Sequence, residues 1–182
     1  TDYLSISFSA VDAVNHFFGP SSLENEAVVR QLDRTLADLL QYVDKTVGLV
    51  ATVIVLSADH GMVEMPEYAS ELGHSAGRLF SDEVLALSRK LSTTLFGTDE
   101  LVKDFFRPYL YLDAQKIAEQ KLEREEVAAA MARELARAEG IGGAIATNGP
   151  RHATATGAVA AVYHNHHPER GGDIYLFQSP YW

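Results

Sequence analysis

Two acid–histidine pairs are the residues of this sequence whose types and spacing suggest chemistry. Asp59 and His60 are adjacent at the end of an apolar run, and Asp12 and His16 lie four residues apart near the start of the chain. A carboxylate oxygen beside an imidazole nitrogen is a donor combination that suits zinc and other divalent transition ions. Both pairs are therefore candidate metal ligands.

The apolar run before Asp59 predicts a buried strand. Five of the six residues from Thr52 to Ser57 are β-branched or leucine. That composition is typical of a strand covered on both faces, as in a parallel sheet. Open α/β sheets bind their ligands beyond the carboxyl ends of such strands, which is where Asp59 and His60 fall. Gly61 would let the backbone turn there without a Cβ penalty.

A second strand is predicted ahead of the other pair. Residues 2–9 alternate polar and apolar side chains, with Leu4, Ile6 and Phe8 on one side. If residues 10–16 form a helical turn, Asp12 and His16 lie on one helix face within reach of one ion. Structural explanations stay open: each aspartate could cap a helix or a strand end, and each histidine could be a loop residue.

The remaining sequence alternates helical and strand patterns. Leucines and valines at helical spacing predict a helix of about six turns that starts near Glu24 and ends near Gly48, connecting the two strands in a right-handed β-α-β unit. Further elements are predicted as a helix from Ser81 to Gly97, a strand at Pro108–Asp113, a helix after Glu123, strands at 141–147 and 174–177, and a loop at 148–150.

Four stretches of the chain follow the pattern of a known family. They are Phe8-Ser-Ala-Val-Asp12-Ala-Val-Asn-His16-Phe-Phe-Gly-Pro20, the spacer helix that contains Leu32-Asp33, Ser57-Ala-Asp-His-Gly-Met62 and, more weakly, Pro168-Glu-Arg-Gly-Gly-Asp-Ile174. In these stretches the sequence resembles the alkaline phosphatase superfamily, and is most similar to the branch of type I phosphodiesterases and nucleotide pyrophosphatases. The resemblance implies an α/β fold in which a mostly parallel sheet is flanked by helices. It also implies that this fold is present only in part, with a smaller subdomain inserted at about residues 64–165.

The resemblance implies a cofactor and a reaction. The cofactor would be two divalent metal ions, most simply zinc, with Asp12 and His16 matching ligands of one ion and Asp59 and His60 matching ligands of the other. The family completes its sites with a Ser or Thr nucleophile and further ligands that this chain does not contain. We therefore expect an internal or C-terminal portion of a larger zinc-dependent enzyme, which hydrolyses phosphate mono- or diesters through a covalent phospho-Ser/Thr intermediate. The piece itself is expected to be inactive. The alternatives are a non-catalytic domain or scaffold that retains metal-site motifs, and a sulfatase-type relative.

Composition limits the partners. The 182 residues carry 25 acids against 15 bases, for a formal net charge of −10, which argues against a nucleic-acid or anionic-membrane surface. The expected partner is a small phosphate ester, and no membrane-spanning segment is visible. Cysteine is absent, which excludes disulfides and thiolate ligands. The family resemblance implies a periplasmic or extracellular location, whereas the oligomeric state is not predicted.

The other histidines have weaker patterns. His74 lies in a glycine-punctuated loop and is expected to be an exposed or gating residue. His164 and His166 would share one face of a strand and could then chelate a metal, although exposed histidines before a turn are the favoured interpretation. His152 lies just before this group. Asp173 and Arg170 are expected to pair across a tight turn, and Arg124 to be an ordinary surface charge.

Overall fold

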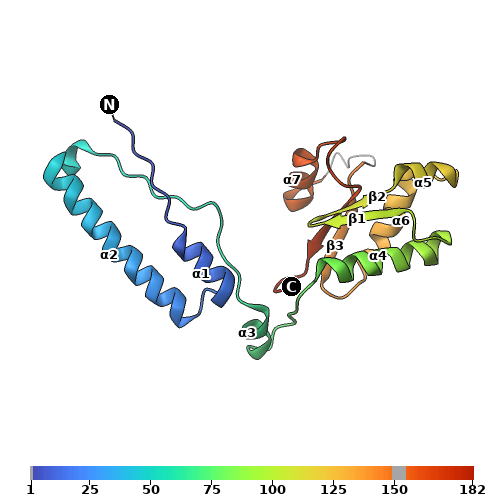
Figure 1. Cartoon of the computed structure of the whole chain (residues 1–182), viewed down its shortest axis with the longest axis horizontal. Coiled ribbons are helices and arrows are strands. Elements are labelled where there is room, and N and C mark those ends of the chain that lie inside the picture. The colour runs from blue at the N-terminus through green and yellow to red at the C-terminus, as the bar shows by residue number, and fades with distance from the viewer. Residues whose placement is uncertain (1, 149–154) are drawn as a thin grey trace. The chain divides into compact units, whose positions relative to one another are not determined.

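A computed structural model describes residues 2–148 and 155–182, so the predicted loop at 148–150 falls largely outside the described residues and His152 entirely so. The chain divides into two compact units, which we call unit 1 (Thr1–Gly73) and unit 2 (His74–Trp182). Each unit is described by itself, and Figure 1 labels the elements of both.

Unit 1 consists of helices joined by extended segments. Its longest helix begins after Ser22, whose hydroxyl caps the helix by accepting a hydrogen bond from the amide of Asn25. The predicted long helix is thus confirmed, and the predicted helical turn at residues 10–16 is confirmed as the start of a helix that packs on it (Figure 1). The elements are α1 (Ala10–Phe18), α2 (Leu23–Thr46), the 3₁₀ turn η1 (Leu49–Ala51) and α3 (Pro66–Glu71).

The two strands predicted in unit 1 do not form. Residues 2–9 and 52–58 contain no helix or strand, and the run that should be covered on both faces is exposed, at 91% for Val53 and 83% for Val55. A strand needs neighbouring strands to satisfy its backbone amides and carbonyls. The sheet that the structure describes lies in unit 2, so these segments have no partner in it and the expected β-α-β unit is not closed.

Unit 2 is an antiparallel sheet with helices on one face. The sheet has the strand order β1-β2-β4-β3, and every described pairing in it is antiparallel, in contrast to the parallel direction expected for the strands of unit 1. The predicted strands at 108–113, 141–147 and 174–177 are confirmed, and β1 is an additional one. The elements are α4 (Ser81–Phe96), β1 (Val102–Phe106), β2 (Tyr109–Leu112), α5 (Ala114–Glu119), α6 (Arg124–Leu135), β3 (Ile141–Ala146), α7 (Gly157–Asn165) and β4 (Ile174–Gln178).

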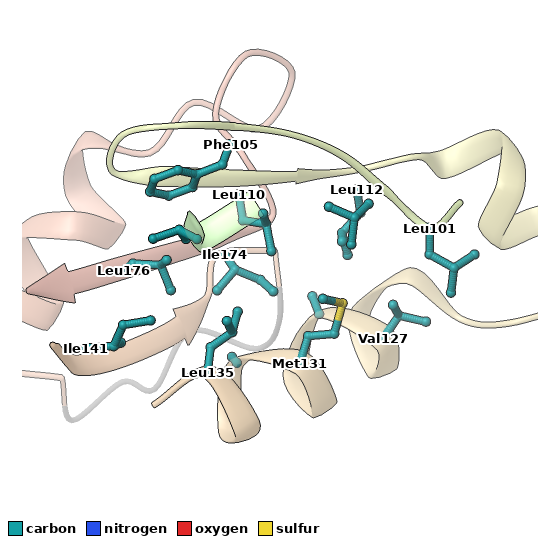
Figure 2. Packing of buried hydrophobic residues seen from close by; sticks show 14 of the residues in the cluster. Leu101, Phe105, Leu110, Leu112, Val127, Met131, Leu135, Ile141, Ile174 and Leu176 are labelled. Carbon is teal, nitrogen blue, oxygen red and sulfur yellow. The ribbon is translucent and has the colours of Figure 1, made fainter. Parts of the chain in front are cut away.

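The hydrophobic core of the chain lies in unit 2, between the sheet and helices α4 and α6. The i, i+4, i+8 series Val127, Met131 and Leu135 on α6 is buried, as its spacing predicts. Figure 2 shows Met131 and Leu135 on the side of Leu110 and Ile174 of the central strands, and Val127 opposite Leu101. Helix α4 packs on β1 and contacts α6, so both helices cover the same face. Helix α4 ends at Gly97, whose φ of 81° is in the left-handed region that glycine adopts readily.

Asp173 is a buried acid that connects strand β2 and helix α6 through hydrogen bonds. Asp173 is 1% exposed, and its carboxylate accepts hydrogen bonds from Nε of Arg124 at 2.5 Å and from the amide of Leu112 at 2.8 Å. The expectation that Asp173 pairs with Arg170 is therefore wrong, and so is the description of Arg124 as an ordinary surface charge. The tight turn leaves Arg170 exposed, whereas α6 carries Arg124 to the buried carboxylate.

Candidate metal centre

Helix α1 presents the first acid–histidine pair. Asp12 and His16 lie one turn apart, which places both side chains on one face of the helix. Oδ1 of Asp12 and Nε2 of His16 are 3.4 Å apart, and both side chains are at least half exposed. The N-cap position of α1 is Ser9, so the alternative in which Asp12 serves as a helix N-cap is wrong.

The second pair lies in an extended segment that the chain brings to α1. Nε2 of His60 is 3.6 Å from Oδ2 of Asp59 and 3.6 Å from Oδ1 of Asp12. The rings of His16 and His60 meet edge to face, with centroids 6.5 Å apart. Unit 1 thus brings all four sequence-predicted residues together, although the two pairs are more than forty positions apart in the chain.

The separations within each pair suit two ligands of one metal ion. Nitrogen and oxygen ligands bind zinc at about 2.0–2.1 Å, so two ligands of one tetrahedral ion lie about 3.3 Å apart. The observed 3.4 Å for Asp12 and His16 and 3.6 Å for Asp59 and His60 are close to that value. Both exceed the 2.7–3.2 Å or so of an N–H···O hydrogen bond. The pairs are close enough to share an ion and too far apart to be strongly hydrogen-bonded to each other.

A backbone contact orients the His60 ring. Nδ1 of His60 lies 2.9 Å from the carbonyl oxygen of Gly61, a geometry in which Nδ1 carries the hydrogen and Nε2 faces the carboxylates. This is how a backbone carbonyl commonly fixes the tautomer of a metal-binding histidine. The Gly61 contact, followed by the negative charge of Asp59, raises the pKa of His60 above its ordinary value of 6.5, and Asp12 adds to the effect.

The donor set fits a pair of ions that are each held only in part by this chain. Each pair offers one carboxylate and one imidazole, a set suited to a divalent transition ion. Within residues 2–148 and 155–182, no group of three or more His, Asp, Glu or Cys side chains is placed to hold one ion. Two ligands for each ion is also the number that the sequence motifs provide.

The described histidines outside this group belong to unit 2. His74 belongs to unit 2, where its exposed ring stacks on Tyr181 with centroids 4.8 Å apart. His164 lies on helix α7 and not on a strand, so the predicted shared strand face with His166 is wrong. His166 follows that helix, is 8% exposed and lies 3.0 Å from Oδ1 of Asn148 through Nε2. It is a packed residue of unit 2.

Sequence reasoning missed the contacts that connect the two motif segments. Oγ of Ser21 donates to Oε1 of Glu64 at 2.5 Å, and Met65 lies against Gly19. Ser21 and Glu64 are separated by 43 positions, and neither belongs to a recognisable pattern. The sequence offered one signal of these contacts, Gly19, which directly follows the helix of Asp12 and His16. A helix can end without a glycine, so a glycine there can mark the close approach of another segment.

Two of the following relatives match the whole chain, and a third matches most of it. It is 28% identical over its full length to a calcium-transporting ATPase of Myroides odoratus and 26% identical, again over its full length, to alkaline phosphatase PhoV of Synechococcus elongatus. It is 33% identical to alkaline phosphatase PafA of Elizabethkingia meningoseptica over 70% of the chain. The chain spans 33%, 33% and 23% of the lengths of these three proteins, respectively.

A solved structure and a family model agree with these matches. The crystal structure of wild-type alkaline phosphatase PafA superposes with a TM-score of 0.76 at 28% identity, over 93% of this chain and 32% of that one. The expected α/β fold of the alkaline phosphatase superfamily is thereby confirmed. The model of the family described as "Type I phosphodiesterase / nucleotide pyrophosphatase" matches residues 1–182. The chain belongs to the type I phosphodiesterase/nucleotide pyrophosphatase family.

Proposed function

We propose that the chain is the part of a phosphohydrolase that supplies two ligands to each of two divalent metal ions, most simply zinc. The observation that carries this is the convergence of Asp12, His16, Asp59 and His60 with ligand-like separations of 3.4–3.6 Å. Family membership and the similarity to two alkaline phosphatases support a phosphoryl-transfer reaction. The substrate is a small phosphate mono- or diester, and the hydrolysis passes through a phospho-Ser/Thr intermediate whose nucleophile lies outside this chain.

Each acid–histidine pair has its own task in this proposal. Asp12 and His16 would hold the ion that serves the leaving group and the attacking water, and Asp59 and His60 would hold the ion that serves the nucleophile. When bound, the ions supply positive charge that stabilises phosphoryl oxygens and lowers the pKa of a hydroxyl group. The carbonyl of Gly61 keeps the hydrogen of His60 on Nδ1, which leaves Nε2 free to bind. The carboxylates reduce the net positive charge of the site.

The electrostatics of the chain agree with a metal-dependent site for an anion. The net charge of −10 would repel a phosphate ester, and the four residues themselves contribute two carboxylates. Bound cations would supply positive charge for a phosphate ester despite the acidity of this chain. The same charge disfavours nucleic acid as a partner.

Turnover of chromogenic esters tests the proposal. The complete gene product that carries this chain should hydrolyse p-nitrophenyl phosphate or bis(p-nitrophenyl) phosphate. Asp59→Ala should lower kcat by more than about 10³-fold, because it removes a group that organises the charge of the site. His164→Ala is the matched control and should retain activity, since His164 is an exposed residue of α7. Near-normal turnover by Asp59→Ala would remove Asp59 from the site.

Two alternatives have distinct outcomes in the same assays. A non-catalytic scaffold would turn over neither ester and would bind no divalent ion at the four residues. A sulfatase-type relative would hydrolyse p-nitrophenyl sulfate faster than either phosphate ester.

We also propose that the protein acts in the periplasm or outside the cell, as the family resemblance implies. No helix among the described residues is both long and apolar enough to cross a membrane. Cell fractionation of the producing organism tests the location, and activity confined to the cytoplasmic fraction would contradict it.

Residues 64–165 contain most of unit 2, and we propose that this region is the smaller inserted subdomain. The assignment rests on the family resemblance and on the separate core of unit 2. Expression of residues 74–182 alone tests it, because an inserted subdomain with its own core should give a cooperative unfolding transition. A non-cooperative transition would contradict the assignment.

A further inference from the structure

The corner between α1 and α2 is closed by a chain of hydrogen bonds that starts within the first metal motif. Asn15 lies between Asp12 and His16 in sequence, is 5% exposed, and donates through Nδ2 to the carbonyl of Val11 and to Oδ1 of Asn25. Asn25 in turn donates to the carbonyl of Pro20 at 2.7 Å. The helix that carries Asp12 and His16 is therefore fixed to the start of α2.

Gly19 lets the second motif segment approach this corner. Helix α1 ends at Gly19, which is buried and has a φ of 82° and a ψ of 162°. A Cβ added to it would lie 2.7 Å from Cγ of Met65 and 3.5 Å from the backbone nitrogen of Met65. Contacts below 3.0 Å require something to move. The missing side chain of Gly19 thus makes the space that the Met65 side chain occupies.

A hydrogen bond lies next to this packing contact. Oγ of Ser21 donates to Oε1 of Glu64 at 2.5 Å, and Glu64 and Met65 follow His60 by four and five residues. The carbonyl of Met65 also accepts a hydrogen bond from the amide of Ala69 in α3, so the segment continues directly into a helix. Two adjacent residues after the second motif therefore contact two residues of the corner that follows the first motif.

We propose that Gly19 and Ser21, with Glu64 and Met65, form a tether that sets the spacing between the Asp12/His16 pair and the Asp59/His60 pair. These four are positioning residues, and the proposal rests on the proposed function because the spacing matters for binding two ions. The segment from Thr52 to Val63 is largely exposed, so its own packing does little to place His60. The tether holds this segment at Glu64 and Met65, which follow His60 by four and five residues.

The test compares two glycines in the protein. In Gly19→Ala the new methyl group displaces Met65, whereas in Gly48→Ala it meets nothing within 4 Å. Both glycines have positive φ, at 82° and 92°, and both follow a helix of unit 1, so alanine strains the backbone at either position. Ser21→Ala removes the hydrogen bond without backbone strain.

Two readouts separate the tether from the metal site. Zinc affinity by calorimetry should fall about 10- to 100-fold in Gly19→Ala, the range for residues that orient metal ligands. Zinc affinity should be unchanged in Gly48→Ala. NMR order parameters of amides 59–65 in metal-free protein should be lower in Gly19→Ala and Ser21→Ala than in Gly48→Ala, because the segment would then be less restrained.

The outcomes distinguish the tether from the function. Equal zinc affinity and equal order parameters in Gly19→Ala and Gly48→Ala would overturn the tether. Absence of zinc binding in the unsubstituted protein would overturn the proposed function instead. In that case the order parameters of the metal-free protein still decide whether the tether holds the segment.

Discussion

Replacing Asp173 by alanine should destabilise unit 2 in an amount that the structure lets us work out. The carboxylate is 1% exposed and accepts hydrogen bonds from the buried amide of Leu112 and from Arg124, with a longer contact of 3.3 Å from Nδ2 of Asn148. The substitution removes the acceptor and keeps the three donors. Its cost therefore depends on how easily each donor finds water.

The two main donors differ in this respect. The amide of Leu112 lies in a buried strand residue, and leaving such a group without an acceptor costs about 1–3 kcal/mol. The side chain of Arg124 is 44% exposed and regains water, so the loss of its ion pair is closer to the value of about 1 kcal/mol for a screened pair. The sum is about 3 kcal/mol.

Urea denaturation followed by circular dichroism measures this change. The matched control is Arg170→Ala, because Arg170 is exposed and is the partner that the sequence suggested for Asp173. Its expected effect is within about 0.5 kcal/mol. The reasoning is refuted if Asp173→Ala costs less than about 0.5 kcal/mol, a value ordinary for surface substitutions. It is equally refuted if Arg170→Ala costs as much as Asp173→Ala.

Two further predictions concern the core and the candidate metal centre. Met131→Ala should lower the free energy of unfolding by about 2–5 kcal/mol, because Met131 is fully buried between α6 and the sheet; urea denaturation measures this, and a change below about 1 kcal/mol would contradict the packing described. In metal-free protein, NMR titration should give His60 a pKa above 6.5, and Asp59→Asn should lower that pKa because it removes a nearby negative charge. Protons and zinc compete for Nε2, so zinc affinity should decrease as the pH falls through this raised pKa, beginning at a higher pH than for an ordinary histidine. A His60 pKa that is unchanged in Asp59→Asn would show that the carboxylate does not act on the ring.

Local patterns predicted helices α1, α2, α4 and α6 and strands β2, β3 and β4, but not α3, α5, α7 or β1. The spacing of Val127, Met131 and Leu135 specifies a helix with one buried face, and the structure has it. Ser22 and Gly97 mark helix ends through chemistry that acts within a few residues, namely a hydroxyl cap and a positive φ. Such signals are readable because cause and effect are close in sequence.

Long-range contacts were not predictable in the same way. The apolar run from Val53 to Leu56 has the composition of a buried strand, but whether it pairs depends on other strands, and none of those described pairs with it. The partner of Asp173 was assigned to the nearest arginine in sequence, whereas the fold brings Arg124 to it from 49 positions away. Composition does not encode which distant residue reaches a site.

The candidate metal centre lies between these two cases. Asp12 and His16 share a face because a helix repeats every 3.6 residues, which the sequence could show. The approach of His60 to Asp12 required the family resemblance to suggest it, since nothing local connects the two motifs. The contacts of Gly19 with Met65 and of Ser21 with Glu64 became visible only in the structure.

Zinc content tests the central claim most directly. The protein would be dialysed against a low concentration of zinc, and zinc per chain would be measured by elemental analysis for the unsubstituted protein and for Asp59→Ala/His60→Ala. The double variant His164→Ala/His167→Ala serves as control, because both of these histidines are exposed residues of unit 2. We predict that zinc is retained by the unsubstituted protein and by the control and is reduced in Asp59→Ala/His60→Ala. Equal zinc in the unsubstituted protein and in Asp59→Ala/His60→Ala would contradict the assignment of Asp59 and His60 as metal ligands.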